Sequence, residues 1–182
     1  MIDKDIERGR YDKRAKKLLK TDSFNISDKI FLPLKAPYVS YQNQIKGLRA
    51  QNLCRVLEIG AGMGENTEFL LESDFNVCAT DISSISVKVM KKRFSKYGNF
   101  SSEVADMENL PFDNELFDLV CSAGSLSYGD NTKVMNEIHR VMKPGGVFIC
   151  VDSLNENPIY IVNRWLGYVR GKRTLSTIAR MP

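Results

Sequence analysis

Three closely spaced glycines carry the clearest chemical signal in this sequence. Gly60, Gly62 and Gly64 follow the apolar run 56–59 and precede a segment with helical periodicity. A strand that enters a glycine-rich turn and then a helix brings backbone N–H groups and a helix N-terminus close to a nucleotide-like ligand. Glycine suits such a turn because a Cβ would block close approach or disfavour left-handed backbone angles. The pattern therefore predicts a ligand-binding loop over residues 60–64.

The spacing of these glycines differs from that of a dinucleotide-binding loop. The dinucleotide pattern is G-x-G-x-x-G, whereas here Glu65 stands where its last glycine would be. An acidic residue also stands two positions before the first glycine. This E-x-G-x-G-x-G pattern resembles the first motif of the class I S-adenosylmethionine-dependent methyltransferases. The resemblance implies that this segment binds S-adenosylmethionine through Glu58, Gly60, Ala61, Gly62 and Gly64.

Two carboxylates stand at the ends of further predicted strands. Asp81 follows segment 76–80, and Asp106 follows segment 100–104. Ligands of open parallel sheets bind outside the carboxyl ends of the strands, so both side chains are expected at the ligand edge. Asp81 could accept hydrogen bonds from both hydroxyls of a ribose, as NAD-binding domains also do. A helix N-cap for Asp81 and a solvated turn for Asp106 are the alternative interpretations.

The residues around Asp106 extend the resemblance. Asp106 followed by the segment 110–112, Leu-Pro-Phe, is similar to the family's adenine-binding segment. The resemblance implies that Asp106 accepts a hydrogen bond from the adenine amino group and that the backbone amide of Met107 meets a ring nitrogen. Ile82 would then supply an apolar face for the ring.

The resemblance implies that the segment 117–128 lies beneath the methionine part of the cofactor, with contacts from Ser122 and Ala123. In the family this segment also opens toward the methyl acceptor. Tyr11 is expected to close over the methionine part from the N-terminal segment. A general base is needed only if the acceptor arrives protonated. The sequence assigns no base, and Tyr128 is the one candidate.

Alternating strands and helices must position these side chains. Short apolar segments alternate with segments of helical periodicity along the chain. This alternation predicts right-handed βαβ units and a doubly wound, Rossmann-like α/β fold with helices on both faces of a parallel sheet. The resemblance implies the strand order 3-2-1-4-5 and two further strands, which we expect to be missing because no strand pair follows the helix predicted over 156–170. The expected strands are 55–59, 76–80, 100–104, 117–121 and 146–152, and the other expected helices are 4–20, 38–50, 65–72, 84–96 and 131–142.

The chain is expected to hold one main domain and a helical cap. Residues 1–50 are predicted to form an N-terminal lid or cap segment, and residues 51–182 a cofactor-binding domain that is incomplete at its C-terminus. The turn 143–146, Lys-Pro-Gly-Gly, and the single histidine, His139, are expected away from the ligand edge. The helix before them begins at that edge and runs back along the sheet, so we expect structural roles for both.

Composition argues against several other classes of protein. Hydrophobic content of 43% and charged content of 26% are typical of a soluble globular protein. The sequence contains no run of about 18 apolar residues, so no transmembrane helix is expected. The N-terminus lacks the apolar core of a signal peptide. Four widely spaced cysteines predict reduced thiols in a cytoplasmic protein and no metal site. The sequence contains no basic patch interleaved with aromatic residues, so nucleic-acid binding is not expected.

Charge is segregated along the chain. Residues 1–20 hold eight basic and four acidic side chains, and residues 164–182 hold five basic and none acidic. Basic ends could attract an anionic partner, whereas solvated helical faces are the alternative. The segment 163–173 combines Trp165 with four basic residues, which raises the hypothesis of an anionic or lipid-linked sugar acceptor. An ordinary packing helix is the alternative there.

The resemblance implies transfer of a methyl group from S-adenosylmethionine, with S-adenosylhomocysteine as product, to a small-molecule or carbohydrate-like acceptor. The sulfonium makes the methyl group electrophilic, so the protein mainly binds, aligns and desolvates the reactants for in-line attack. A non-catalytic S-adenosylmethionine-binding module, or an inactive partner subunit, is the main alternative. An NAD-linked oxidoreductase is a weaker one, because the glycine spacing and Asp106 argue against it. The acceptor and the oligomeric state are left open.

Overall fold

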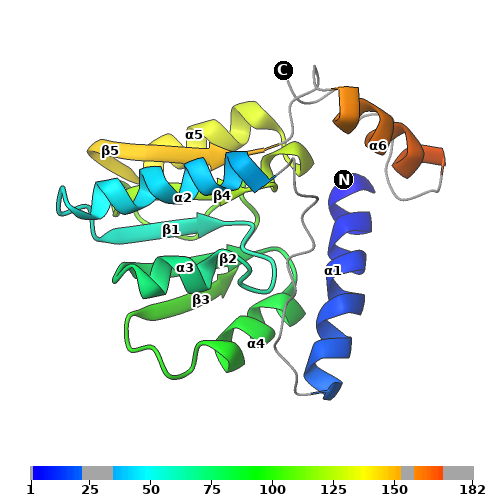
Figure 1. Ribbon diagram of the computed structural model, residues 1–182, viewed down its shortest axis with the longest axis horizontal. Coiled ribbons are helices and arrows are strands. Elements are labelled where there is room, and N and C mark those ends of the chain that lie inside the picture. The colour runs from blue at the N-terminus through cyan, green and yellow to red at the C-terminus, as the bar shows by residue number, and fades with distance from the viewer. Residues whose placement is uncertain (1, 22–34, 153–157, 170–182) are drawn as a thin grey trace.

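The computed structural model describes residues 2–21, 35–152 and 158–169. Within this part of the chain, five strands form one sheet in the order β3-β2-β1-β4-β5 (Figure 1). All neighbouring strands are parallel. The expected fold class and strand order are therefore confirmed. The strands are β1 Arg55–Ile59, β2 Asn76–Asp81, β3 Phe100–Val104, β4 Phe117–Ala123 and β5 Met142–Val151.

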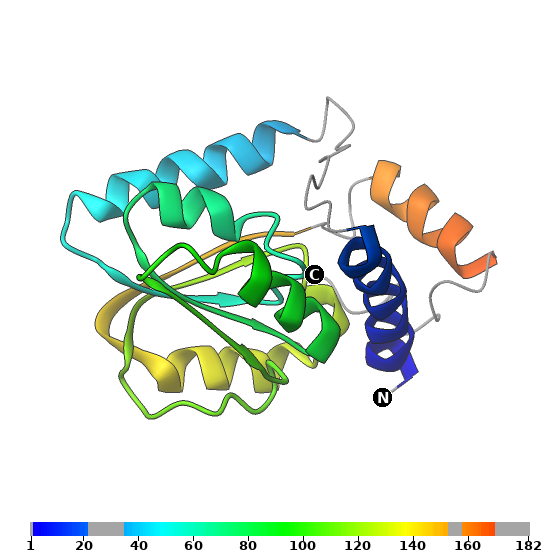
Figure 2. The same cartoon turned by 90° about the horizontal axis from the view of Figure 1, so that it is seen from below.

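Helices cover both faces of the sheet, which explains why its central strands are almost continuously apolar. Helices α2 (Lys35–Arg49), α3 (Thr67–Glu72) and α4 (Ser84–Arg93) share one cluster of buried side chains with one face. Helix α5 (Asn131–Val141) packs on the other face, with Val134, Ile138 and Val141 against side chains of β1 and β4. Figure 2 shows α2 and α3 on one side of the sheet and α5 on the other.

Two helices lie beyond the carboxyl ends of the strands. These are α1 (Ile2–Thr21) and α6 (Pro158–Val169), which occupy the same end of the molecule in both views (Figures 1 and 2). Helix α1 is held there by Ala15, which is fully buried in one cluster with Met63 of the glycine loop and Val89 of α4. The N-terminal helix therefore packs against the elements that carry the predicted ligand edge.

Some element boundaries differ from those predicted. Strand β5 begins at Met142, so the expected turn 143–146 falls inside it. The turn is visible as an irregularity, because the pairing of β4 with β5 shifts register between Phe117 and Leu119. Helix α2 begins at Lys35 and includes Pro37, which is tolerated because N–H groups of the first turn have no intrahelical partner. Most of the segment between the expected helices 4–20 and 38–50 lies outside the described residues, as do both ends of the helix expected over 156–170.

The described residues contain no helix long and apolar enough to span a membrane. The same residues contain no group of three or more His, Cys, Asp or Glu side chains that could hold a metal ion.

Candidate functional site

A cavity lies at the carboxyl edge of the sheet. The chain leaves β1 toward β2 and β3 on one side and returns to β4 and β5 on the other, and the diverging loops at such a reversal create a binding crevice. We call this space the strand-end cavity. Its walls come from the ends of β1 to β4, from η2 (Leu126–Tyr128) and from α1, through Lys4, Arg8, Tyr11, Ile59, Gly60, Thr80, Asp81, Ile82, Ala105, Asp106, Met107, Ala123, Gly124, Ser125 and Tyr128.

The glycine loop allows the ends of β1 and β4 to approach each other. Gly60 has a φ of 65°, and a Cβ built on it would lie 2.3 Å from the Cβ of Ser125. The Ser125 hydroxyl donates to the backbone carbonyl of Ile59 at 3.2 Å and lies 2.6 Å from the hydroxyl of Ser122. A side chain at residue 60 would therefore push the β4 segment away from β1.

The other two glycines of the loop meet protein side chains. A Cβ at Gly62 would lie 2.9 Å from Oε2 of Glu65 and 3.1 Å from Cε1 of Tyr11. A Cβ at Gly64 would lie 2.3 Å from Cε2 of Phe94. These glycines therefore serve the packing of the loop against α1 and α4, and neither lines the strand-end cavity.

Asp81 joins the end of β2 to the glycine loop. Its Oδ2 accepts a hydrogen bond from the backbone N–H of Gly62 at 2.9 Å, and its Oδ1 accepts from the N–H of Ser83 at 2.8 Å. The N-cap of α4 is Ser83, whose hydroxyl accepts a hydrogen bond from the N–H of Ser86. Asp81 is therefore not the N-cap, which was the alternative interpretation for this residue. A carboxylate oxygen has more than one acceptor site, so Asp81 can also accept from a ligand hydroxyl.

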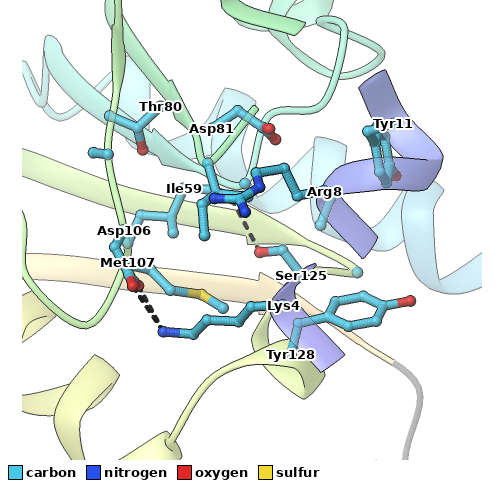
Figure 3. A pocket seen from close by; sticks show the side chains of 15 residues that line it. Lys4, Arg8, Tyr11, Ile59, Thr80, Asp81, Asp106, Met107, Ser125 and Tyr128 are labelled. Carbon is cyan, nitrogen blue, oxygen red and sulfur yellow. Dashed lines mark hydrogen bonds and ion pairs between the residues drawn. The ribbon is translucent and has the colours of Figure 1, made fainter. Parts of the chain in front are cut away.

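Asp106 is paired with the N-terminal helix. The Lys4 ammonium donates to both carboxylate oxygens of Asp106, at 2.8 and 2.9 Å (Figure 3). It also lies 2.8 Å from Oε1 of Glu108. Burial alone would lower the pKa of Lys4, but the hydrogen bonds to the two carboxylates outweigh it and the pKa is raised. Burial would likewise raise the pKa of Asp106, yet the hydrogen bond from Lys4 brings it below its ordinary value. Burial would also raise the pKa of Glu108, but its hydrogen bond with Lys4 brings the pKa below its ordinary value, so all three groups are charged near neutral pH.

Further contacts from α1 close one side of the strand-end cavity. Figure 3 shows Arg8 and Tyr11 on this side, opposite Asp106 and Met107. Ser83 donates a short hydrogen bond to the carboxylate of Asp12, and Arg14 lies 3.3 Å from Oε1 of Glu65. The helix is thus attached at the end of β2 and at the glycine loop, in addition to Asp106.

Glu58 lies beneath the glycine loop and does not line the strand-end cavity. Its side chain is 1% exposed, and its Oε2 accepts a hydrogen bond from the hydroxyl of Thr67 at 2.5 Å. Burial raises the pKa of this carboxyl to about 8, although the hydrogen bond from Thr67 acts in the opposite direction. In this position Glu58 joins β1 to the first residue of α3.

The structure brings most of the predicted site residues together. Eight of them line the strand-end cavity, namely Tyr11, Gly60, Asp81, Ile82, Asp106, Met107, Ala123 and Tyr128. Five others are absent from its lining: Glu58, Ala61, Gly62, Gly64 and Ser122. The lining residues that the sequence analysis missed are Lys4, Arg8, Ile59, Thr80, Ala105, Gly124 and Ser125.

Two signals could have found the missed residues. Five of them adjoin predicted site residues or follow them within two positions at the strand ends. Lys4 and Arg8 precede Tyr11 by seven and three residues in the sequence, which places all three on one face of a helix. Helical periodicity, once Tyr11 was chosen, therefore pointed to both cations.

The comparison with protein families identifies the class to which this fold and cavity belong. Residues 57–150, more than half of the chain, match the methyltransferase domain family. The chain belongs to this family, and with it to the class I S-adenosylmethionine-dependent methyltransferases. S-adenosylmethionine is the methyl donor of that class.

The match to each individual relative covers only part of that relative's length. YodH, an uncharacterized methyltransferase of Bacillus subtilis, is 32% identical over 105 residues, which are 57% of this chain and 45% of YodH. A demethylmenaquinone methyltransferase of Clavibacter sepedonicus is 34% identical over 116 residues, 63% of this chain and 46% of the relative. The crystal structure of YcgJ from Bacillus subtilis superposes with a TM-score of 0.59 at 25% identity, covering 72% of this chain and 61% of YcgJ. The chain thus spans about half the length of these two curated relatives.

Proposed function

We propose that the chain binds S-adenosylmethionine in the strand-end cavity and transfers its methyl group to a small-molecule acceptor. The observation that carries this proposal is the pairing of carboxylates with apolar side chains at two adjacent strand ends. Asp81 and Ile82 line the cavity after β2, and Asp106 and Met107 line it after β3. This arrangement suits a ligand that joins a hydroxylated sugar to a flat aromatic ring.

Each strand end receives one part of the cofactor in this proposal. Asp81 accepts from the ribose hydroxyls, because each oxygen of a carboxylate can accept more than one hydrogen bond. Ile82 and the Met107 backbone amide hold the adenine ring. Gly60 and Ala123 face the methionine part, which Tyr11 covers from α1. Glu58 contributes indirectly, by holding the loop to α3 through Thr67.

The adenine amino group shares Asp106 with Lys4 or replaces it. Lys4 already donates to both oxygens of Asp106 and also contacts Glu108. Release from Asp106 therefore leaves the ammonium paired with Glu108, which lowers the cost of the exchange. The N-terminal helix consequently responds to cofactor binding in this proposal, as expected for a lid.

The residues of the chain mainly align the reactants and exclude water. When bound, the cofactor supplies an electrophilic methyl group on a sulfonium, so no covalent bond to the protein is needed. Walls contributed by four strand ends and α1 hold both reactants in one geometry, which favours in-line attack. Tyr128 is the candidate for orienting the acceptor, or for taking its proton where the acceptor carries one.

The acceptor class is inferred from charge and from relatives. The relatives include methyltransferases named for demethylmenaquinone and for a sterol, which are small molecules. The exposed basic side chains along α1 favour an anionic group on the acceptor, whereas Lys4 and Arg8 in the cavity lining are already paired with carboxylates. A carbohydrate-like or lipid-linked sugar acceptor remains the finer hypothesis.

Calorimetric titration with S-adenosylhomocysteine and NAD, side by side, tests the cofactor. We expect micromolar binding of S-adenosylhomocysteine and no measurable binding of NAD. Asp81→Ala should weaken binding roughly tenfold to a hundredfold, because hydrogen bonds to a charged group contribute about 1.5–3 kcal/mol. His139→Ala on the exposed side of α5 is the matched control and should bind as the wild type does.

Three outcomes separate the proposal from its alternatives. Wild-type protein that binds neither ligand refutes the proposal for this chain. Tight binding of NAD instead supports the oxidoreductase. Binding of S-adenosylhomocysteine without transfer of labelled methyl to any small molecule of a cell extract supports the non-catalytic module.

A further inference from the structure

Helix α6 presents an apolar stripe to solvent. Its five exposed large apolar side chains are between 41% and 62% exposed. Their spacing of one, four, seven and eight residues from the first places them on one side of the helix. Contiguous exposed apolar surface of this kind marks a site of interaction in soluble proteins. We call it the α6 stripe, and it consists of Ile161, Val162, Trp165, Tyr168 and Val169.

Helix α1 presents a positively charged face. Every exposed side chain between residues 10 and 20 is basic. Asp12, the one carboxylate in this range, is half-buried and accepts a hydrogen bond from Ser83. The opposite side of the helix packs against the body through Ala15, Leu18 and their neighbours. We call the exposed side the α1 basic face, which consists of Arg10, Lys13, Arg14, Lys16, Lys17 and Lys20.

Both surfaces lie at the end of the molecule that carries the strand-end cavity. Helices α1 and α6 lie beyond the carboxyl ends of the strands in both views (Figures 1 and 2). Lys4, Arg8 and Tyr11 of α1 line the cavity itself. An apolar stripe and a cationic face therefore accompany the candidate site at one end of the molecule.

We propose that the α6 stripe and the α1 basic face together dock this end of the protein onto an anionic membrane surface. Amphipathic helices lie in the membrane interface when they combine apolar side chains with nearby positive charge. Tryptophan and tyrosine favour the boundary between lipid and water, and the stripe holds one of each. Anionic headgroups attract lysine and arginine close to the surface. The protein rests on the bilayer in this arrangement, with its strand-end cavity near the lipid.

Charge selects the membrane over a second copy of the chain. The whole sequence carries a net charge of +4, and a second copy would bring its own α1 basic face to the contact. Like charges oppose such an association, whereas an anionic bilayer satisfies the apolar stripe and the positive charge together. Docking does not depend on the proposed methyl transfer, although it would give a lipophilic acceptor a short path to the cavity.

Fluorescence of the full chain provides a direct test. Trp165 is the single tryptophan of the sequence and lies within the α6 stripe. We expect vesicles of phosphatidylcholine and phosphatidylglycerol to shift its emission to shorter wavelength at low salt. Lipids brominated on the acyl chains should quench the emission. High salt should weaken binding, because exposed charges are screened over about 8 Å already at physiological ionic strength.

Variants of the two surfaces separate their contributions. Ile161→Ser combined with Val169→Ser should abolish the blue shift. Val39→Ser, which replaces a valine 52% exposed on α2, is the matched apolar control and should bind vesicles normally. Lys13→Ser combined with Lys16→Ser should lower partitioning by about twenty-five-fold, because each basic side chain near an anionic surface contributes about fivefold. Circular dichroism verifies that each variant is folded.

Several results would overturn the proposal. One is an emission spectrum unchanged by anionic vesicles at low salt. A second is equal binding by the wild type and the stripe variant. A blue shift that grows with protein concentration in the absence of lipid, together with a dimer in sedimentation equilibrium, would assign the stripe to a second copy. Capture of an acidic protein by a chain that ignores purified vesicles would assign it to a protein partner.

Discussion

At the scale of single residues, side chains of the strand-end cavity both organise the protein and face the ligand space. Asp81 binds the backbone of Gly62 and Ser83 while its carboxylate lines the cavity. Asp106 binds Lys4 across the cavity wall. Substitutions at these positions therefore change the protein and the ligand contact together, and paired controls are needed to tell the two effects apart.

Lys4→Met tests whether the lysine competes with the cofactor. The substitution frees Asp106 for the adenine amino group, so we expect S-adenosylhomocysteine to bind up to about fivefold more tightly, the upper range for a partly exposed ion pair. Lys13→Met on the α1 basic face is the control and should leave affinity unchanged. Weaker binding by Lys4→Met would show that Lys4 contacts the cofactor directly.

At the scale of secondary-structure elements, the end of β1 is stabilised by contacts that the loop sequence alone does not reveal. Gly60 lies against Ser125 of the segment after β4, and Glu58 is bonded to Thr67 at the start of α3. Both contacts join elements that are far apart in the chain or on opposite sides of the loop. The loop geometry therefore depends on its neighbours as much as on its glycines.

Gly60→Ala should destabilise the protein more than Gly145→Ala. Both glycines have positive φ, 65° and 77°, so both substitutions carry the left-handed backbone cost of roughly 1–2 kcal/mol. A Cβ at Gly60 meets Ser125 at 2.3 Å, whereas a Cβ at Gly145 meets nothing within 4 Å. The difference between the two unfolding free energies, from urea denaturation, measures the contact. Equal destabilisation would contradict the close approach of β1 and β4.

The Glu58 carboxyl should make stability fall as pH rises. Burial raises its folded-state pKa from 4.5 to about 8, so the folded protein holds a proton that the unfolded chain releases in this range. Stability is therefore fully present below about pH 4.5, declines toward about pH 8 and then levels off. Glu58→Gln should remove this decline, which amounts to a few kcal/mol at about 1.4 kcal/mol for each pKa unit. Urea denaturation of both proteins across this range isolates the effect, and parallel curves would show that Glu58 does not titrate there.

At the scale of the whole molecule, the N-terminal helix is attached separately from the core of the sheet. The two main clusters of buried side chains contain no residue of α1. Helix α1 belongs instead to a third cluster, in which Ala15 packs with Met63 and Val89. The helix can therefore leave the body without opening the sheet.

Ala15→Asp should detach α1 while the sheet stays folded. A carboxylate at this fully buried position has no partner in its apolar cluster, so its burial is unfavourable. We expect faster hydrogen exchange across residues 2–21, unchanged protection of β1 and β4, and weaker binding of S-adenosylhomocysteine because Tyr11 leaves the cavity. Lys16→Asp, on the exposed side of the same helix, should do none of this. Loss of protection throughout the sheet would show that α1 is part of the main folding unit.

The sequence by itself determined the sheet and the edge at which the ligand site forms. Strand and helix periodicities are local, and parallel strands necessarily bring their carboxyl ends to one edge. Gly60, Asp81 and Asp106 could therefore be assigned to a common site before any tertiary contact was known.

Only the tertiary structure decided which neighbouring side chains enter that site. β1 is buried on both faces, so its apolar pattern does not reveal that Glu58 points toward α3 and away from the cavity. Lys4 and Arg8 share a helical face with Tyr11, but that face reaches the cavity only because α1 docks across the strand ends. Such docking depends on contacts between residues distant in the chain, such as Ala15 with Val89, and local sequence patterns carry no record of them.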